Sequence, residues 1–305
     1  MKLRLATRKS KLALWQAEET RARICAARPD FEVELVKVES TGDRDQATDL
    51  ARFGRIGIFT VEVDRTLQEG RADIGVHSLK DLTTELVEGI VLGGVLPRGP
   101  VADALISRGD HTLGTLPKGA RVATGSMRRR AMLLAARPDL DVVEIRGNVD
   151  TRLAKLKAGD ADAIVLAQAG LVRLGLDEHI TELLDLPHFL SAVGQGIVGL
   201  TTRADNREVR KLLSNISDQE SHHEALAERA LLAGLRGGCN VPVGALARVR
   251  EGALSLRARV LSLDGTECVE AEISGSRDHA KELGRMLSTD LNERGADRLI
   301  AEARQ

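Results

Sequence analysis

Short apolar runs alternate with longer Ala- and Leu-rich stretches through the first two-thirds of this 305-residue chain. The spacing is that of β-α units, in which each strand is followed by a helix that covers the sheet. We expect strands at residues 3–5, 33–38, 72–76, 121–124, 142–145 and 163–167, a helix from Ser10 toward Pro29, and another at 60–69. The pattern predicts an α/β fold with mixed, mainly parallel sheets.

Two segments rich in glycine and proline interrupt this alternation. One is Leu96-Pro97-Arg98-Gly99-Pro100, and the other is Val193-Gly194-Gln195-Gly196. Such residues favour a change of chain direction. We therefore expect the chain to cross between two lobes at each segment, with a cleft between the lobes. The predicted first domain comprises residues 1–97 and 197–215, and the second comprises residues 101–193.

The last third of the chain has a different pattern. A helix is expected at about 220–235, followed by strands around turns at Arg250-Glu251-Gly252 and Asp264-Gly265. One final helix is expected over about 278–303. The prediction is a third, α+β domain over residues 219–305.

Composition excludes several classes of function. The 44 basic and 45 acidic residues nearly cancel, so the whole molecule has no field that favours nucleic acid or an anionic membrane. Aromatic residues make up only 2% of the chain, which leaves few rings for base stacking. We find no signal peptide, membrane-spanning stretch or Cys-x-x-Cys pair, and we expect a cytoplasmic protein without a metal site or disulfides.

Basic residues follow five of the predicted strands. Ligands of open parallel sheets bind at the carboxyl ends of the strands, and arginine forks suit carboxylate or phosphate groups. No Walker-type glycine-rich loop is present, so nucleotide phosphate is the weaker choice. Any one of these residues could instead be a solvated surface charge. The basic and hydroxyl residues concerned are Arg8, Ser10, Lys80, Ser126, Arg128, Arg129, Arg146, Arg152 and Arg173.

Two further residues carry chemistry of other kinds. Asp81 follows Lys80 and is the carboxylate that we expect to face a ligand in this basic cleft, where it could move a proton or stabilise a cation. Outside such a cleft it would be an ordinary salt-bridged surface residue. Cys239 follows two glycines and precedes Pro242, which presents its thiol on a constrained turn as a nucleophile or covalent anchor. The alternative for this cysteine is a small buried hydrophobic residue.

Taken together, the motifs resemble porphobilinogen deaminase, also called hydroxymethylbilane synthase. Six segments match in chain order, from near the first residue to the last domain. They are residues 6–10 (ATRKS), 72–81 (ADIGVHSLKD), 126–129 (SMRR), 146–149 (RGNV), 192–196 (AVGQG) and 237–242 (GGCNVP).

The resemblance implies a fold and a reaction. The first two lobes should look like type II periplasmic binding proteins, and the cysteine of the third domain should point into their cleft. Family members are transferases that join four porphobilinogen units head to tail with loss of ammonia. The linear tetrapyrrole grows on a dipyrromethane cofactor held by a cysteine thioether and is then hydrolysed off. A monomer is also implied.

The resemblance also assigns roles residue by residue. Cys239 matches the cofactor cysteine, and Asp81 matches the catalytic aspartate, which also contacts the cofactor. Other cofactor-binding positions are matched by Lys80, Ser126, Arg128, Arg129 and Arg146. Positions that grip cofactor or substrate carboxylates are matched by Arg8, Ser10, Arg152 and Arg173.

Three positions depart from the family pattern. Ile56 occupies the place of a customary loop lysine, for which the neighbouring Arg55 could substitute. Thr83 replaces a usual proline, and Gly125 replaces a common serine. Two alternatives to an active transferase therefore stay open. One is a weakened paralogue that binds a pyrrole or another polycarboxylate, and the other is a pure binding protein built on the same two lobes.

Overall fold

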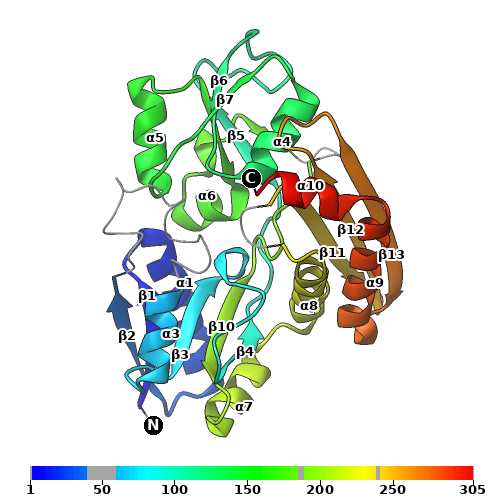
Figure 1. Ribbon diagram of the computed structural model, residues 1–305. Helices are drawn as coiled ribbons and strands as arrows, with labels where there is room; N and C mark the ends of the chain where they lie inside the picture. The colour runs from blue at the N-terminus through cyan, green and yellow to red at the C-terminus, as the bar shows by residue number, and fades with distance from the viewer. Residues whose placement is uncertain (1, 40–59, 185–188, 238–240, 305) are drawn as a thin grey trace.

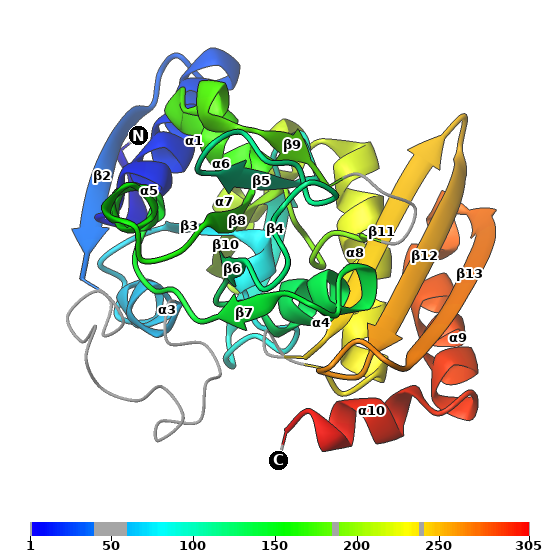
Figure 2. The same cartoon turned by 90° about the horizontal axis from the view of Figure 1, so that it is seen from above.

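The computed structural model describes residues 2–39, 60–184, 189–237 and 241–304. Its strands form three sheets, two of five strands and one of three. The two five-stranded sheets are the centres of two lobes, one above the other in Figure 1. Figure 2 shows the three-stranded sheet at one side of both lobes. The α/β class with mixed sheets and a small α+β unit is confirmed.

The first lobe is built on the sheet β2-β1-β3-β10-β4. Its hydrophobic core packs fully buried Leu3, Leu5 and Ile74 against helices. Two of these helices begin at side-chain caps, Ser10 for α1 and Asn206 for α7. The elements are β1 (Lys2–Arg8), α1 (Lys11–Ala27), β2 (Glu32–Val38), α3 (Val61–Gln68), β3 (Ile74–Ser78), β4 (Ile90–Val95), β10 (Val198–Arg203) and α7 (Arg207–Ile216), with a short 3₁₀ helix at Leu79–Asp81.

The second lobe repeats this architecture with the sheet β7-β6-β8-β5-β9. Helices α4 and α5 are capped by the side chains of Ser126 and Asn148, and Gly159 ends α5 in the left-handed conformation. The elements are β5 (Asp103–Ser107), β6 (Arg121–Ala123), α4 (Met127–Ala136), β7 (Asp141–Val143), α5 (Val149–Ala158), β8 (Ala163–Ala167), α6 (Gln168–Leu174) and β9 (Glu182–Leu183), with a 3₁₀ helix at Asp177–His179.

Both lobes contain one strand that opposes the others. It is β10 in the first sheet and β5 in the second, and each is the first described strand after the chain enters that lobe from the other. The two crossing segments lie side by side, because the Gly99 amide donates to the Gly196 carbonyl at 3.0 Å. Gly196 has φ +86, and a Cβ there would lie 2.7 Å from the Gly99 carbonyl oxygen, so only glycine fits.

The third unit pairs β11 (Val243–Arg250), β12 (Ala253–Leu261) and β13 (Cys268–Ser276) as an antiparallel meander, with hairpin turns at the two expected places. Helix α8 (Gln219–Gly234) packs against α9 (Ala280–Glu293) and β11. The expectation of one final helix is wrong. A 3₁₀ turn at Arg277–His279 precedes α9, and α10 (Ala296–Glu302) follows a break at Gly295. The φ of +96 at Gly295 is left-handed and cannot continue a helix.

A buried ionic cluster joins the third unit to both crossings. Arg98 donates to Glu228 at 2.7 Å and to Glu224 at 3.0 Å, and all three side chains are at least nine-tenths buried. Glu228 also accepts the backbone amides of Gly194 and Ala247 at 2.6 and 2.8 Å. Helix α8 therefore holds the first crossing, the second crossing and β11 at one point.

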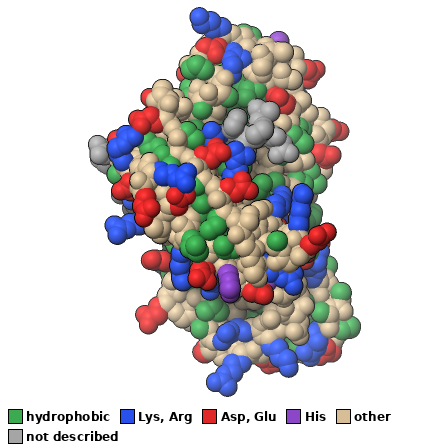
Figure 3. Space-filling view, turned by 90° about the vertical axis from the view of Figure 1, so that its right-hand side faces the viewer, with side chains coloured by type: hydrophobic (Ala, Val, Ile, Leu, Met, Phe, Trp, Pro, Cys, Tyr) green, Lys and Arg blue, Asp and Glu red, His purple; other side chains and the backbone are tan. Residues whose placement is uncertain are grey.

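The molecular surface has no large face of one charge in the view of Figure 3, where acidic and basic side chains are interspersed. This agrees with the near cancellation of charge in the sequence. No helix among the described residues is long and apolar enough to cross a membrane.

Candidate active site

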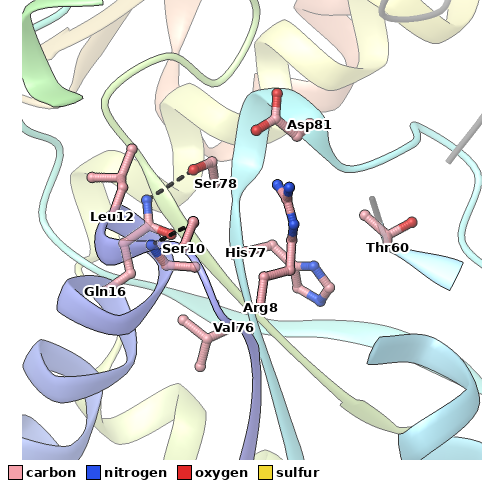
Figure 4. Close-up of a pocket in the computed structure, with 10 residues that line it drawn as sticks. Arg8, Ser10, Leu12, Gln16, Thr60, Val76, His77, Ser78 and Asp81 are labelled. Carbon is pink, nitrogen blue, oxygen red and sulfur yellow. Dashed lines mark hydrogen bonds between the residues drawn. The ribbon is translucent and has the colours of Figure 1, made fainter. Parts of the chain in front are cut away.

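A cavity of about 80 Å³ opens in the first lobe at the ends of β1 and β3 (Figure 4). Polar and charged side chains dominate its wall. The lining residues are Arg8, Ser10, Leu12, Ala13, Gln16, Thr60, Val76, His77, Ser78 and Asp81. The cavity therefore brings together three residues that the sequence singled out, Arg8, Ser10 and Asp81.

The first turn of α1 forms one wall of the cavity. Arg8 is the last residue of β1, and its side chain extends toward Asp81 (Figure 4). Ser10 is the N-cap, and its hydroxyl accepts the Ala13 amide at 3.3 Å. Two turns along, the Gln16 side-chain amide donates to the Ser78 hydroxyl at 2.8 Å, which ties α1 to the end of β3.

Asp81 ends the 3₁₀ helix that directly follows β3. The turn is closed by the Leu82 amide, which donates to the Leu79 carbonyl at 3.1 Å. His77 is the next-to-last residue of β3, and its Nε2 lies 3.0 Å from the Thr201 hydroxyl. Burial first, and then the charges of Arg229 and Arg8, lower the pKa of His77 to about 4. The imidazole is therefore neutral at physiological pH, and Asp81 and Arg8 are the charged groups of the cavity.

Lys80 links this turn to the other lobe. Its ammonium lies 3.4 Å from the Gln195 side-chain oxygen, and Gln195 in turn donates to the Asp103 carboxylate at 2.9 Å. Burial and the charge of Arg129 lower the pKa of Lys80 to about 8, although Asp81 and Asp103 act in the opposite direction. Lys80 therefore lies in a buried region within electrostatic reach of two arginines, Arg129 and Arg128, and two carboxylates, Asp81 and Asp103.

Asp103 on β5 is the centre of the second-lobe half of the site. One carboxylate oxygen accepts hydrogen bonds from Nε and from a terminal nitrogen of Arg129, at 3.0 and 2.7 Å. The other oxygen lies 2.7 Å from a terminal nitrogen of Arg128. Burial alone would raise the pKa of Asp103, but the two guanidinium groups hold it well below its usual range. Both arginines follow the N-cap Ser126 in the first turn of α4.

The arginines are thus placed differently from the sequence expectation of side chains at an open edge. Arg128 and Arg129 are only 3% and 6% exposed. Two cations share one carboxylate, so the cluster keeps a net positive charge. The Nε atom of Arg128 is buried without a hydrogen-bond partner among the described residues. Because both side chains are buried, the pair can act on an anion mainly through its electrostatic field.

The other three predicted arginines have different partners. Arg152 donates to the Gly147 carbonyl at 2.8 Å, and burial and the charge of Arg129 lower its pKa, while Asp81 raises it. Arg173 donates to the Gly196 carbonyl at 2.6 Å and lies 5.3 Å from the centre of the Trp15 ring on the first lobe. Arg146 is paired with Glu144 at 2.8 Å and is more exposed.

Some expectations fall on residues that the structure does not describe. Cys239 and the departures at Arg55 and Ile56 lie outside the described ranges. Gly125, which replaces a common serine, lies within them, and a Cβ there would approach the Ile145 carbonyl oxygen to 3.0 Å. A serine would need a small adjustment of the backbone at this point.

Sequence reasoning missed four polar residues of the site. Asp103 could have been found, because it is the single charge within the apolar run of residues 101–106. Gln195 and His77 lie inside matched segments but carried no assigned role. Gln16 gave no signal, because only the packing of α1 against β3 brings it to Ser78.

Fold and site together define a class. The chain is a two-lobed α/β protein whose strand ends carry buried cations, a neutral histidine and the half-buried carboxylate of Asp81, which suits a ligand with several carboxylates. Among the described residues there is no cluster of His, Cys, Asp and Glu that could hold a metal ion.

Comparison with known protein families shows to which family of this class the chain belongs. The family model "Porphobilinogen deaminase, dipyromethane cofactor binding domain" matches residues 3–211, and "Porphobilinogen deaminase, C-terminal domain" matches residues 222–293. The chain belongs to the porphobilinogen deaminase family. It is accordingly a transferase of tetrapyrrole biosynthesis with a dipyrromethane cofactor.

Individual relatives agree with the family. The chain is 43% identical over 303 residues to porphobilinogen deaminase of Syntrophomonas wolfei, covering 99% of each chain. It is 46% identical over 300 residues to the enzymes of Desulforudis audaxviator and Xanthomonas campestris, covering 98% of this chain and 97% and 99% of theirs.

Solved structures with a similar fold include binding proteins. One is a putative methionine-binding lipoprotein from Bacillus subtilis, with 12% identity and a TM-score of 0.45 over 70% of this chain and 89% of that one. Another is an alkanesulfonate-binding protein from Xanthomonas axonopodis, with 18% identity and a TM-score of 0.39 over 76% and 79%.

The residues present fit a dipyrromethane. Its acetate and propionate groups are anions, and the site holds an excess of buried cations. The positive charges of Lys80, Arg128 and Arg129 favour such groups.

Proposed function

We propose that this protein polymerises four porphobilinogen units head to tail, with release of ammonia, to give the linear tetrapyrrole hydroxymethylbilane. The dipyrromethane, when bound, supplies the pyrrole on which the chain grows. We propose that a thioether to Cys239 holds it, an assignment supported by the match of residues 237–242 to the family motif. The chain's other residues bind, orient and stabilise charge.

Asp81 is the proposed catalytic residue. Its carboxylate lies at the mouth of the cavity beside Arg8 and can accept a hydrogen bond from a pyrrole N-H (Figure 4). When ammonia leaves porphobilinogen, the remaining methylene-pyrrolenine is a cation, and a carboxylate held nearby stabilises it. The neutral His77 below adds no competing positive charge.

The basic residues are proposed to hold the acidic side chains of cofactor and substrate. Lys80, Ser126, Arg128, Arg129 and Arg146 are assigned to the cofactor, together with Asp81. Arg8, Ser10, Arg152 and Arg173 are assigned to cofactor or substrate carboxylates. A charge-assisted hydrogen bond of this kind contributes about 1.5 to 3 kcal/mol.

One observation carries this proposal furthest. The charge of Asp81 acts on both Lys80 and Arg152, so the carboxylate lies within electrostatic reach of cations from both lobes. A carboxylate within reach of cations that come from both lobes suits a reaction that forms a cation on a substrate held by its acidic groups.

The organisation of the whole chain is also part of the proposal. We place domain 1 at residues 1–97 and 197–215, domain 2 at 101–193 and domain 3 at 219–305. The three sheets support this division. We further propose a monomer, as the family resemblance implies, and a cytoplasmic location, as expected from the sequence.

The direct test follows ammonia release and tetrapyrrole formation from porphobilinogen. Wild type should form both products, and Asp81→Ala should keep its fold, by circular dichroism, but lose at least about 100-fold in kcat. Near-normal turnover by Asp81→Ala would remove this residue from the mechanism. A wild type that binds porphobilinogen without releasing ammonia would instead support a weakened, binding-only paralogue.

A further inference from the structure

Arg229 of the third unit contacts the chain directly after Asp81. It lies on α8, beside Glu228 of the buried cluster. Its guanidinium donates three hydrogen bonds to consecutive backbone carbonyls, those of Leu82 at 3.2 Å, Thr83 at 2.7 Å and Thr84 at 3.1 Å. These carbonyls belong to the segment that leaves the 3₁₀ helix ending at Asp81.

The first residue of this segment is also held by packing, because the Leu82 side chain is buried in a hydrophobic cluster with Ile197 and Ala225. The hydrogen bonds within the segment run from the Leu82 amide to the Leu79 carbonyl and from the Thr83 hydroxyl to the Glu85 carbonyl at 2.6 Å. Thr83 also lacks the fixed φ that a proline would give at this position. Three donors from one planar guanidinium therefore hold the backbone carbonyls of residues 82–84, in addition to the packing of the Leu82 side chain.

Helix α8 also contacts the two lobe crossings. Glu228, the preceding residue, accepts from Arg98 and from the Gly194 amide in the two crossings. Glu228 and Arg229, which are consecutive residues of α8, therefore hydrogen-bond to the lobe crossings and to the segment after Asp81, respectively. The charge of Arg229 also contributes, after burial, to keeping His77 neutral, which places Arg229 within electrostatic range of the cavity.

We propose that Arg229 is a positioning residue, which sets the place of the Asp81 carboxylate relative to the third unit through the carbonyls of residues 82–84. This inference rests on the proposed role of Asp81. It also has a consequence for Thr83. Without the restricted φ of a proline at this position, the conformation of the turn depends more strongly on Arg229.

The first test substitutes Arg229→Met, with the exposed Arg285→Met on α9 as the matched control. Displacing a catalytic group by about 1 Å can cost about 100-fold in rate. We expect kcat to fall about 10- to 100-fold in Arg229→Met, with KM within about threefold and an unchanged intact mass. The control should match wild type. A kcat within twofold of wild type, or a loss confined to KM, would overturn the inference.

The second test asks whether Arg229 acts through Asp81. In an Asp81→Glu background the carboxylate is already displaced, so adding Arg229→Met should reduce the remaining kcat by less than about threefold. A full, multiplicative loss would mean that Arg229 works independently of Asp81. If Asp81→Glu and Asp81→Ala are themselves fully active, the proposed function of Asp81 fails, and that failure is visible without any Arg229 variant.

The third test restricts the backbone at position 83 by introducing a proline. Leu82 has φ −86 and ψ 128, the extended conformation that a following proline requires. Thr83→Pro should therefore recover at least about a third of the kcat that Arg229→Met loses, and it should slow hydrogen exchange of the Leu82 amide, which the Arg229→Met change accelerates. Failure of Thr83→Pro to change either quantity would contradict positioning through this segment.

Discussion

At the residue scale, the site is governed by an excess of buried positive charge. Asp103 compensates part of the charge of Arg128 and Arg129, and burial together with the charge of Arg129 lowers the pKa of Lys80 to about 8. The sequence located all three basic residues at strand ends but missed Asp103 as their partner. Pairing of this kind depends on tertiary contacts between β5 and α4, which no local pattern encodes.

The titration of Lys80 tests this picture. In the Cys239→Ser protein, which lacks the proposed tether, we expect the ¹³Cε shift of Lys80 to titrate near pH 8. Asp81→Asn should lower the pKa further, because the charge of Asp81 raises it. Between about pH 8 and 10.5 the folded protein binds fewer protons at this residue than the unfolded chain, so its contribution to stability rises with pH there. A Lys80 that titrates at 10.5 like an exposed lysine would contradict its burial beside Arg129.

At the scale of elements, the sequence predicted helices and strands well where the pattern was strong. Helix α1 begins after Ser10 as expected, and β8 has the predicted bounds. Strand β4 was not anticipated, because Gly93 and Gly94 weaken a strand pattern and β10 supplies the pairing. The break of the last helix at Gly295 was also missed, since a single glycine is tolerated within many helices.

Helices α8 and α9 provide a test of packing at this scale. A Cβ on Gly284 would lie 2.3 Å from the Ala227 carbonyl oxygen, which is backbone and cannot rotate away. We expect Gly284→Ala to lower the free energy of unfolding by about 1 to 3 kcal/mol in urea titrations. Gly114→Ala, where a Cβ meets nothing closer than 4.0 Å, is the control and should change stability little. Equal stability of both variants would mean that the two helices can separate without cost.

At the scale of the whole molecule, the two lobes and the third unit meet at the Arg98 cluster. The crossings at residues 96–100 and 193–196 could be predicted because glycine and proline are local signals. Their attachment to α8 could not be predicted, because Glu224 and Glu228 look like ordinary acidic residues of a helix until the fold buries them. Cys239, which we propose holds the cofactor, follows α8 in the sequence and lies outside the described ranges.

Removal of Arg98 should therefore affect the whole molecule. Arg98→Met leaves Glu228 buried without its cation, and we expect a loss of about 3 to 5 kcal/mol in the free energy of unfolding. Arg121→Met breaks an exposed pair with Asp141 at 3.6 Å and should cost under about 1 kcal/mol. If the two variants unfold at the same denaturant concentration, the Arg98 cluster does not hold the units together.

The central claim is that the chain grows its product on a dipyrromethane tethered to Cys239. Intact-protein mass spectrometry tests it most directly, on wild type and Cys239→Ser produced where porphobilinogen is available. We predict that wild type exceeds its sequence mass by two linked pyrrole units and that Cys239→Ser has its sequence mass alone. An unmodified wild type, or the same added mass on Cys239→Ser, would contradict the account.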